Sequence, residues 1–177
     1  MRPTTDTPCP VRATSRMTST MNGPKTSDVV VPAQRMDTRR TAPDAHAAML
    51  ALDAAVELDP ELRELVRVRA SILNGCAYCV QLHTRDALAA GERSERLFAL
   101  AAWEESPYFS ARERAALAFT DAVTNLQDGH VPDDVYERAA AEFDDEELAQ
   151  LLFAAVAINA WTRLAIATRK LPLPIRS

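Results

Sequence analysis

A helical hairpin is encoded between Pro60 and His83, in the stretch PELRELVRVRASILNGCAYCVQLH. A proline at the first helical position starts the first helix, Pro60–Leu73, and Asn74-Gly75 ends it. Cys76 then opens a second helix that runs to Ala90. Because so short a turn joins the two segments, we expect them to pack as an antiparallel pair.

The rest of the chain after residue 44 also has helical patterns. Ser110 and Glu113 are predicted to form a capping box. Ser94 is expected to cap the helix over residues 95–103, and Asp144 or Asp145 the final helix. No alternating strand pattern appears, so the sequence predicts an all-α fold. The further helices are expected over residues 45–56, 95–103, 110–126, 133–143 and 146–168.

A single domain is expected, preceded by a tail. Residues 1–40 are rich in Thr, Pro, Ser and Arg without any periodic pattern, so we expect them to be disordered, with Cys9 incidental and Met36 a second possible start. Residues 41–177 form the helical domain. The first stretch lacks the apolar core of a secretory signal, and no apolar run reaches the length of a membrane span, so a cytoplasmic location is the default.

The charge is distributed unevenly. The whole chain carries −5, but residues 1–43 hold seven Lys/Arg and three Asp/Glu, a net of +4, which leaves −9 for the remainder. Nucleic-acid binding requires a basic face, so an acidic folded part argues against a nucleic-acid partner. The basic arm is too diluted by Thr, Ser and Pro to change that.

The chemistry of the hairpin centres on Cys76, Cys79 and His83. At 100° per residue, the two cysteines lie about 60° apart around the helix, and Cys79 and His83 about 40° apart, so all three share one stripe. Glu64 lies ten residues before the turn and His83 eight after it, which puts them at roughly the same level. A carboxylate, an imidazole and a thiol in line can draw a proton off the thiol.

Plainer interpretations stay open for each of these residues. The cysteine pair could hold zinc, although no second Cys/His cluster exists to complete four ligands, or could be two inert buried thiols. Glu64 could form an ordinary surface ion pair with Arg63 or Arg67, which lie nearby in the sequence. Tyr78 could pack or donate to a peroxide, and Asn159 could bond across helices or at a subunit contact.

The motif resembles that of a known family. Glu64 followed by Cys76-x-x-Cys79-x-x-x-His83 is similar to the core of the alkylhydroperoxidase D-like (AhpD-like) proteins, within the carboxymuconolactone decarboxylase superfamily. The similarity covers about residues 45–170. Further segments that support it are Arg67–Cys79, Ala101-Ala102-Trp103, Arg112–Ala118, Gly129–Pro132 and Ile158–Leu164.

The resemblance implies an all-helical homo-oligomer, a trimer or hexamer, and a thiol-dependent peroxidase without metal or organic cofactor. By this analogy Cys79 attacks the hydroperoxide, Cys76 resolves the sulfenic acid to a disulfide, and His83 with Glu64 relays the proton. An external dithiol then reduces the pair. Helix-dipole reasoning instead favours Cys76 as the more acidic thiol; we side with the relay.

One position departs from the family pattern. Well-studied members have a histidine between the cysteines, where this chain has Tyr78. The change removes a possible proton donor and bears on peroxidase efficiency more than on thiol–disulfide exchange. Two alternative functions follow: a thiol–disulfide redox relay, and a non-catalytic helical oligomeric binding protein whose cysteines only sense oxidation.

Overall fold

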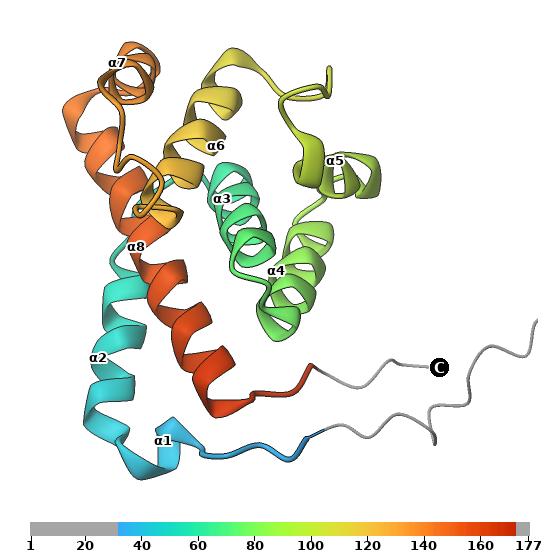
Figure 1. The fold of residues 1–177 in the computed structure, drawn as a ribbon, viewed down its shortest axis with the longest axis vertical. Helices are drawn as coiled ribbons and strands as arrows, with labels where there is room; N and C mark the ends of the chain where they lie inside the picture. Colours follow the sequence, from blue (N-terminus) through green and yellow to red (C-terminus); the bar gives the residue numbers. More distant parts are fainter. Residues whose placement is uncertain (1–31, 173–177) are drawn as a thin grey trace, which may run out of the picture. The chain divides into compact units, whose positions relative to one another are not determined.

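Residues 32–172 are described by the computed structural model of this protein, and they form helices with no strand among them (Figure 1). The prediction of an all-α fold is confirmed for this part of the chain. The elements in chain order are α1 (Thr38–Thr41), α2 (Pro43–Ala54), α3 (Pro60–Leu73), α4 (Ala77–Ala89), α5 (Ser94–Ala99), the 3-10 turn η2 (Leu100–Ala102), α6 (Ala111–Thr124), α7 (Asp133–Glu142) and α8 (Asp145–Thr168).

The helix starts follow the capping signals of the sequence, with one exception. Ser110 and Glu113 form the predicted capping box of α6, and Asp144 caps α8 by accepting a hydrogen bond from the amide three residues on. Ser94 was expected to cap α5, and this is wrong. Arg93 occupies the N-cap without a side-chain hydrogen bond, and Ser94 is the first helical residue. The helix expected up to residue 103 is also split, since its last turn tightens into η2.

Helix α3 lies at the centre, against α4, α6 and α8 (Figure 1). Successive residues point to different neighbours: Leu65 belongs to a buried cluster with Leu117 of α6, and Val66 to another with Leu151 of α8. All four side chains are fully buried. Burying each such side chain stabilises the fold by about 1.5–3 kcal/mol, so α3 is held rigidly from several sides.

Helix α8 is a core helix. By length and composition alone it could cross a membrane, but half of its most apolar stretch is buried against the rest of the described fold. Asn159, near its middle, accepts a hydrogen bond from the Asn74 side chain at 3.0 Å and donates one to Thr124 at 2.9 Å. Of the two interpretations of Asn159, the structure therefore supports the bond across helices, which ties α8 to the end of α3.

The N-terminal tail was predicted over residues 1–40, and its first 31 residues lie outside the described part. The structure does describe residues 32–40, and these include most of α1, which the sequence pattern did not predict. Asp37 caps α1, and the Arg35 amide donates to the Thr168 carbonyl at 2.8 Å. This segment therefore covers the end of α8. The domain boundary at residue 40 stays a prediction.

Candidate active site

The turn between α3 and α4 positions the two cysteines. Asn74 closes α3 as its C-cap, and Gly75 follows with a φ of 65°, a left-handed conformation that glycine adopts without a side-chain clash. Cys76 returns to extended backbone and is the N-cap of α4. Cys76 and Cys79 therefore flank the first turn of α4, as the hairpin prediction required.

The two thiols are buried and in contact with each other. Both are free, with 2% and 3% of their surfaces exposed. The Cys79 amide donates to Cys76 Sγ at 3.3 Å, as in a conventional N-cap. The Cys79 thiol also donates a hydrogen bond to Cys76 Sγ. The Cys76 sulfur is therefore surrounded by donors that favour its ionised form.

The acidity of the pair follows from these hydrogen bonds. The pKa of Cys76 is lowered to about 7, first by the Cys79 thiol and, against the cost of burial, also by the Cys79 and Tyr78 amides and the charge of Lys170. The pKa of Cys79 is raised, because its thiol proton is held by Cys76 and because the sulfur is buried. Cys76 is thus the more acidic thiol, as the helix-terminus argument predicted and the relay argument did not, but the largest cause is the hydrogen bond from the Cys79 thiol.

Glu64 and His83 meet across the hairpin. Glu64 Oε2 of α3 lies 3.1 Å from His83 Nδ1 of α4. The prediction that the two residues lie at the same height along the helical hairpin is therefore confirmed. Glu64 is buried, which by itself raises its pKa, but the hydrogen bond with His83 and the charge of Arg67 outweigh burial and lower it. The ionised carboxylate fixes the imidazole so that Nδ1 faces Glu64 and Nε2 is left for other partners.

Arg67 extends this network to a helix that the sequence did not connect with the site. It donates to Glu64 Oε1 at 2.6 Å and to Asp53 Oδ1 of α2 at 2.9 Å. Of the two arginines expected as ordinary partners of Glu64, Arg67 forms the ion pair, beside the Glu64–His83 contact and with a different carboxylate oxygen. Asp53 gave no signal in the sequence, because nothing in its neighbourhood indicates a partner in α3.

A pocket of about 220 Å³ opens beside the thiols; we call it the thiol pocket. Cys79 and His83 both line it, while Cys76 does not, so Cys79 is the sulfur that a small molecule in this pocket would meet. Its walls combine α2, α4 and the end of α8. The complete lining is Thr38, His46, Leu50, Asp53, Tyr78, Cys79, Leu82, His83, Trp161, Leu164, Ala165, Thr168 and Lys170.

Tyr78 and Lys170 complete the surroundings of the thiols. Tyr78 packs against the buried cluster of Cys76, Cys79 and Ala165, which agrees with packing as its main role, and its ring also faces the thiol pocket. Lys170 Nζ lies 4.2 Å from the centre of that ring. Sequence reasoning missed Lys170, since it lies far along the chain from the motif.

The zinc alternative finds no support in the donor set. Among residues 32–172, no group of three or more His, Cys, Asp or Glu side chains is arranged to hold a metal ion. His46 makes an edge contact with the Trp161 ring instead, with the ring centres 5.3 Å apart. The cysteine pair is thus a two-sulfur site.

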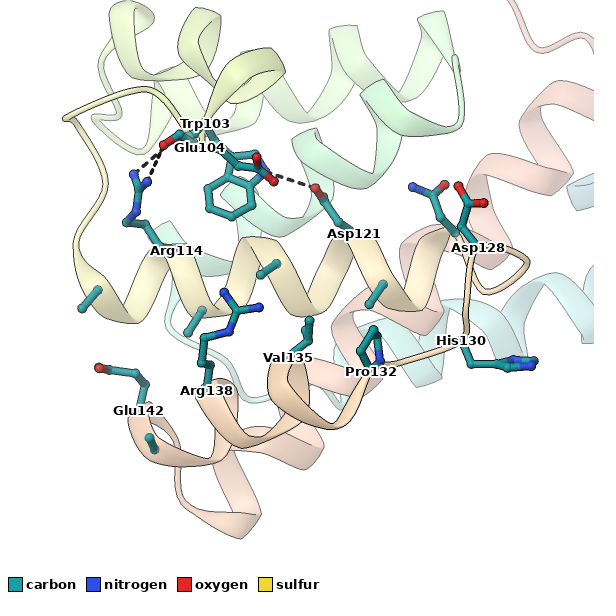
Figure 2. Close-up of a pocket in the computed structure, with 16 residues that line it drawn as sticks. Trp103, Glu104, Arg114, Asp121, Asp128, His130, Pro132, Val135, Arg138 and Glu142 are labelled. Atoms are coloured by element: carbon teal, nitrogen blue, oxygen red, sulfur yellow. Dashed lines mark hydrogen bonds between the residues drawn. The ribbon is translucent and has the colours of Figure 1, made fainter.

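A larger groove of about 730 Å³ lies between α6 and α7, away from the cysteines (Figure 2). Its main polar side chains are already paired. Arg114 donates to the carbonyls of Trp103, Glu104 and Ser106, and Asp121 accepts from the Trp103 indole and from Arg69. No cysteine lines this groove, whereas Cys79 lines the smaller thiol pocket.

Similar proteins share both the sequence and the fold. An uncharacterized protein of Bacillus subtilis strain 168, YdfG, is 34% identical over 137 residues, which make up 76% of this chain and 93% of YdfG. ATU0492 from Agrobacterium tumefaciens is a protein of unknown function that has been suggested to be an antioxidant defence protein AhpD, and its crystal structure is known. Its sequence is 35% identical to that of this chain. It superimposes with a TM-score of 0.79 over 81% of this chain and all of that one.

A more distant structure shares the fold. A peroxidase-related protein with an alkylhydroperoxidase AhpD core from Ralstonia eutropha JMP134 is 22% identical, with a TM-score of 0.68 over 77% of this chain and 74% of its own. Residues 43–122 match the carboxymuconolactone decarboxylase family, and they include the whole hairpin with Glu64, both cysteines and His83. This chain belongs to the carboxymuconolactone decarboxylase family, as one of its AhpD-like proteins.

Proposed function

We propose that this protein is a thiol-dependent peroxidase that reduces organic hydroperoxides through a Cys76/Cys79 disulfide cycle. One observation carries the proposal. At the start of α4 two cysteines are hydrogen-bonded to each other, the pKa of Cys76 is lowered, and Cys79 lines a pocket that His83 also lines. Reactive cysteines require a stabilised thiolate with access to substrate, and this pair combines the two.

The cycle begins with a thiolate at the pocket. The pair carries one negative charge near neutral pH, which rests on Cys76, and His83 takes the remaining proton from Cys79 to leave a thiolate at the pocket. The Cys79 thiolate attacks the distal peroxide oxygen, and the O–O bond breaks. Cys79 becomes a sulfenic acid, and the alkoxide takes up one proton to leave as the alcohol.

The second half of the cycle restores the thiols. The Cys76 thiolate attacks the sulfenic sulfur, and hydroxide leaves as water after taking up a proton, so the product is a Cys76–Cys79 disulfide. An external dithiol reduces this disulfide and is itself oxidised. Two electrons pass from the dithiol to the peroxide in each turn. Neither half requires a cofactor.

His83 serves as the proton carrier in this proposal. The Glu64 carboxylate accepts a hydrogen bond from His83 Nδ1. His83 Nε2 is therefore available to take a proton from Cys79 and to give it to the leaving alkoxide. The Glu64 carboxylate stabilises the imidazolium that forms between these two transfers. Arg67 keeps Glu64 ionised and in place.

We further propose that the protein acts as a homo-oligomer, a trimer or hexamer, in the cytoplasm. Support comes from an apolar face of α8 that the described residues leave exposed: Leu152, Phe153 and Val156 keep 40–49% of their surfaces accessible. Neighbouring apolar side chains exposed on a core helix are typical of an interface. A second copy of α8 would be a chemically matched partner.

The direct test is turnover of cumene hydroperoxide with dithiothreitol as reductant. We expect activity in the wild-type protein and its loss in both Cys76→Ser and Cys79→Ser. Full turnover in both variants would overturn the peroxidase. If the protein reacts with disulfide substrates but not with peroxide, the redox relay would replace the peroxidase as the proposed function. Thiols that react with neither would indicate the non-catalytic binding protein.

A further inference from the structure

The end of α8 directs Lys170 to the thiol pocket. Arg169 adopts a left-handed conformation with a φ of 55°, and the helix closes with two hydrogen bonds, Arg169 N to Ile166 O at 3.1 Å and Lys170 N to Ala165 O at 2.9 Å. This pair of bonds is the Schellman pattern. A left-handed conformation is strained for a residue other than glycine, so the surrounding structure must hold it.

The packing of the same turn fixes where Lys170 lies relative to the cysteines. Ala165, which accepts the Lys170 amide bond, is buried in one cluster with Cys76 and Cys79. Lys170 Nζ lies over the Tyr78 ring, 4.2 Å from its centre, and the side chain lines the thiol pocket. The ammonium group therefore stands at the edge of the pocket that Cys79 faces.

Lys170 has no carboxylate partner within the described structure. No Asp or Glu oxygen of residues 32–172 lies within 4.0 Å of Nζ. Asp53, which lines the pocket, and Glu64, which contacts His83, are both paired with Arg67. A cation left without a counter-charge beside a pocket attracts anions to it.

The other walls of the thiol pocket are mainly apolar. They are formed by Leu50, Leu82, Trp161 and Leu164 together with the Tyr78 ring. With about 220 Å³, the pocket is smaller than the roughly 300–1,000 Å³ of typical drug-sized sites. It fits a compact apolar body, such as a substituted phenyl group, with a polar end at the rim.

We propose that the thiol pocket selects hydroperoxides that combine a compact apolar body with a carboxylate, and that Lys170 binds the carboxylate. This inference rests on the proposed peroxidase function, whose substrate class it narrows. The apolar body lies against Trp161 and Leu82, the peroxide reaches Cys79, and the carboxylate pairs with Lys170 at the rim. Lys170 is then a specificity-determining residue.

The test compares two matched substrates: cumene hydroperoxide with a para-carboxylate, and the same compound with a para-carboxamide. Wild-type protein is measured beside Lys170→Gln and Lys170→Arg, and kcat/KM is obtained for both substrates with each. We expect the wild-type protein to prefer the carboxylate by about fivefold, the upper end for an exposed ion pair. Lys170→Gln should lose that preference, and Lys170→Arg should retain it.

The ratio of the two substrates separates recognition from thiol acidity. The charge of Lys170 also favours the ionised form of both thiols, so the loss of this charge slows the reaction with both substrates alike and cancels in the ratio. Equal kcat/KM for both substrates in the wild-type protein, or an unchanged preference in Lys170→Gln, would overturn the inference. Absence of turnover with either substrate would instead overturn the peroxidase itself, so the two failures are distinguishable.

Discussion

Removal of the Cys79 thiol should make Cys76 less acidic, and the structure sets the size of the effect. The pKa of Cys76 is about 7, against an ordinary value of 9.0, and the hydrogen bond from the Cys79 thiol is the largest cause. At pH 7 a thiol with the first value is about half ionised, and one with the second about 1%. The thiolate fraction therefore falls by up to roughly fiftyfold when the donor is lost.

The reaction rate falls less than the thiolate fraction, because a more basic thiolate is the stronger nucleophile. With a Brønsted coefficient of about 0.4–0.5, the same change in pKa raises nucleophilicity about eightfold, which leaves a net loss of up to about sixfold at pH 7. The pH at the midpoint of the rate profile is thus the sharper readout. It should move from about 7 to the region of 9.0, because burial, which raises the pKa of Cys76, is then opposed only by the backbone amides and the charge of Lys170.

The assay is iodoacetamide alkylation from pH 5 to pH 10 in a Cys9→Ser background, so that a single thiol is left. Cys79→Ala removes the donor, whereas the matched variant Cys79→Ser keeps a hydroxyl that can still donate to Cys76. The midpoint should be higher in the alanine variant than in the serine variant. Identical midpoints would refute the claim that the side chain at position 79 makes Cys76 acidic.

Three further changes test other parts of the account. Glu64→Gln should slow the reaction of Cys79 with peroxide by about tenfold or more in stopped flow, because His83 loses its orienting charge; an unchanged rate contradicts the relay. Leu65→Ala should lower the free energy of unfolding by about 2–5 kcal/mol in urea, and a loss below 1 kcal/mol contradicts its place in the core. Phe153→Glu should shift the mass in light scattering toward the monomer, while the equally exposed Leu126→Glu should not; no difference contradicts assembly through α8.

The hairpin was predictable because its signals are local. A proline start, an Asn-Gly stop and a cysteine at the next N-cap define α3, the turn and α4 within a short stretch of sequence. Helix geometry then sufficed to bring Glu64 level with His83, and the 3.1 Å contact agrees. Short-range periodicity and capping thus contain enough information for this part of the site.

The residues that were missed are held by contacts distant in sequence. Asp53 lines the thiol pocket and pairs with Arg67, and Lys170 lies there because the end of α8 packs on the cysteines. Neither residue has a neighbour that indicates such a contact. Ser94 failed as a cap for the opposite reason: a local rule predicted it, but the helix begins at Ser94 itself, with Arg93 at the N-cap.

The acidity of the two thiols shows where simple rules conflict. The helix-terminus rule favours Cys76, and the neighbouring imidazole favours Cys79. The deciding feature is the hydrogen bond between the sulfurs, which lowers the pKa of one thiol by raising that of the other. Its direction depends on side-chain rotamers, which a sequence does not specify. The pocket then distinguishes the sulfurs in another way, since Cys79 lines it and Cys76 does not.

The central claim is that Cys79 is the sulfur that peroxide oxidises. The most direct measurement is a single turnover of Cys76→Ser protein with one equivalent of cumene hydroperoxide, in the presence of dimedone, followed by peptide mass spectrometry. We predict a dimedone adduct on Cys79, formed together with one equivalent of alcohol. Unmodified Cys79 with peroxide left intact, while Cys79→Ser protein forms the adduct on Cys76, would contradict the account.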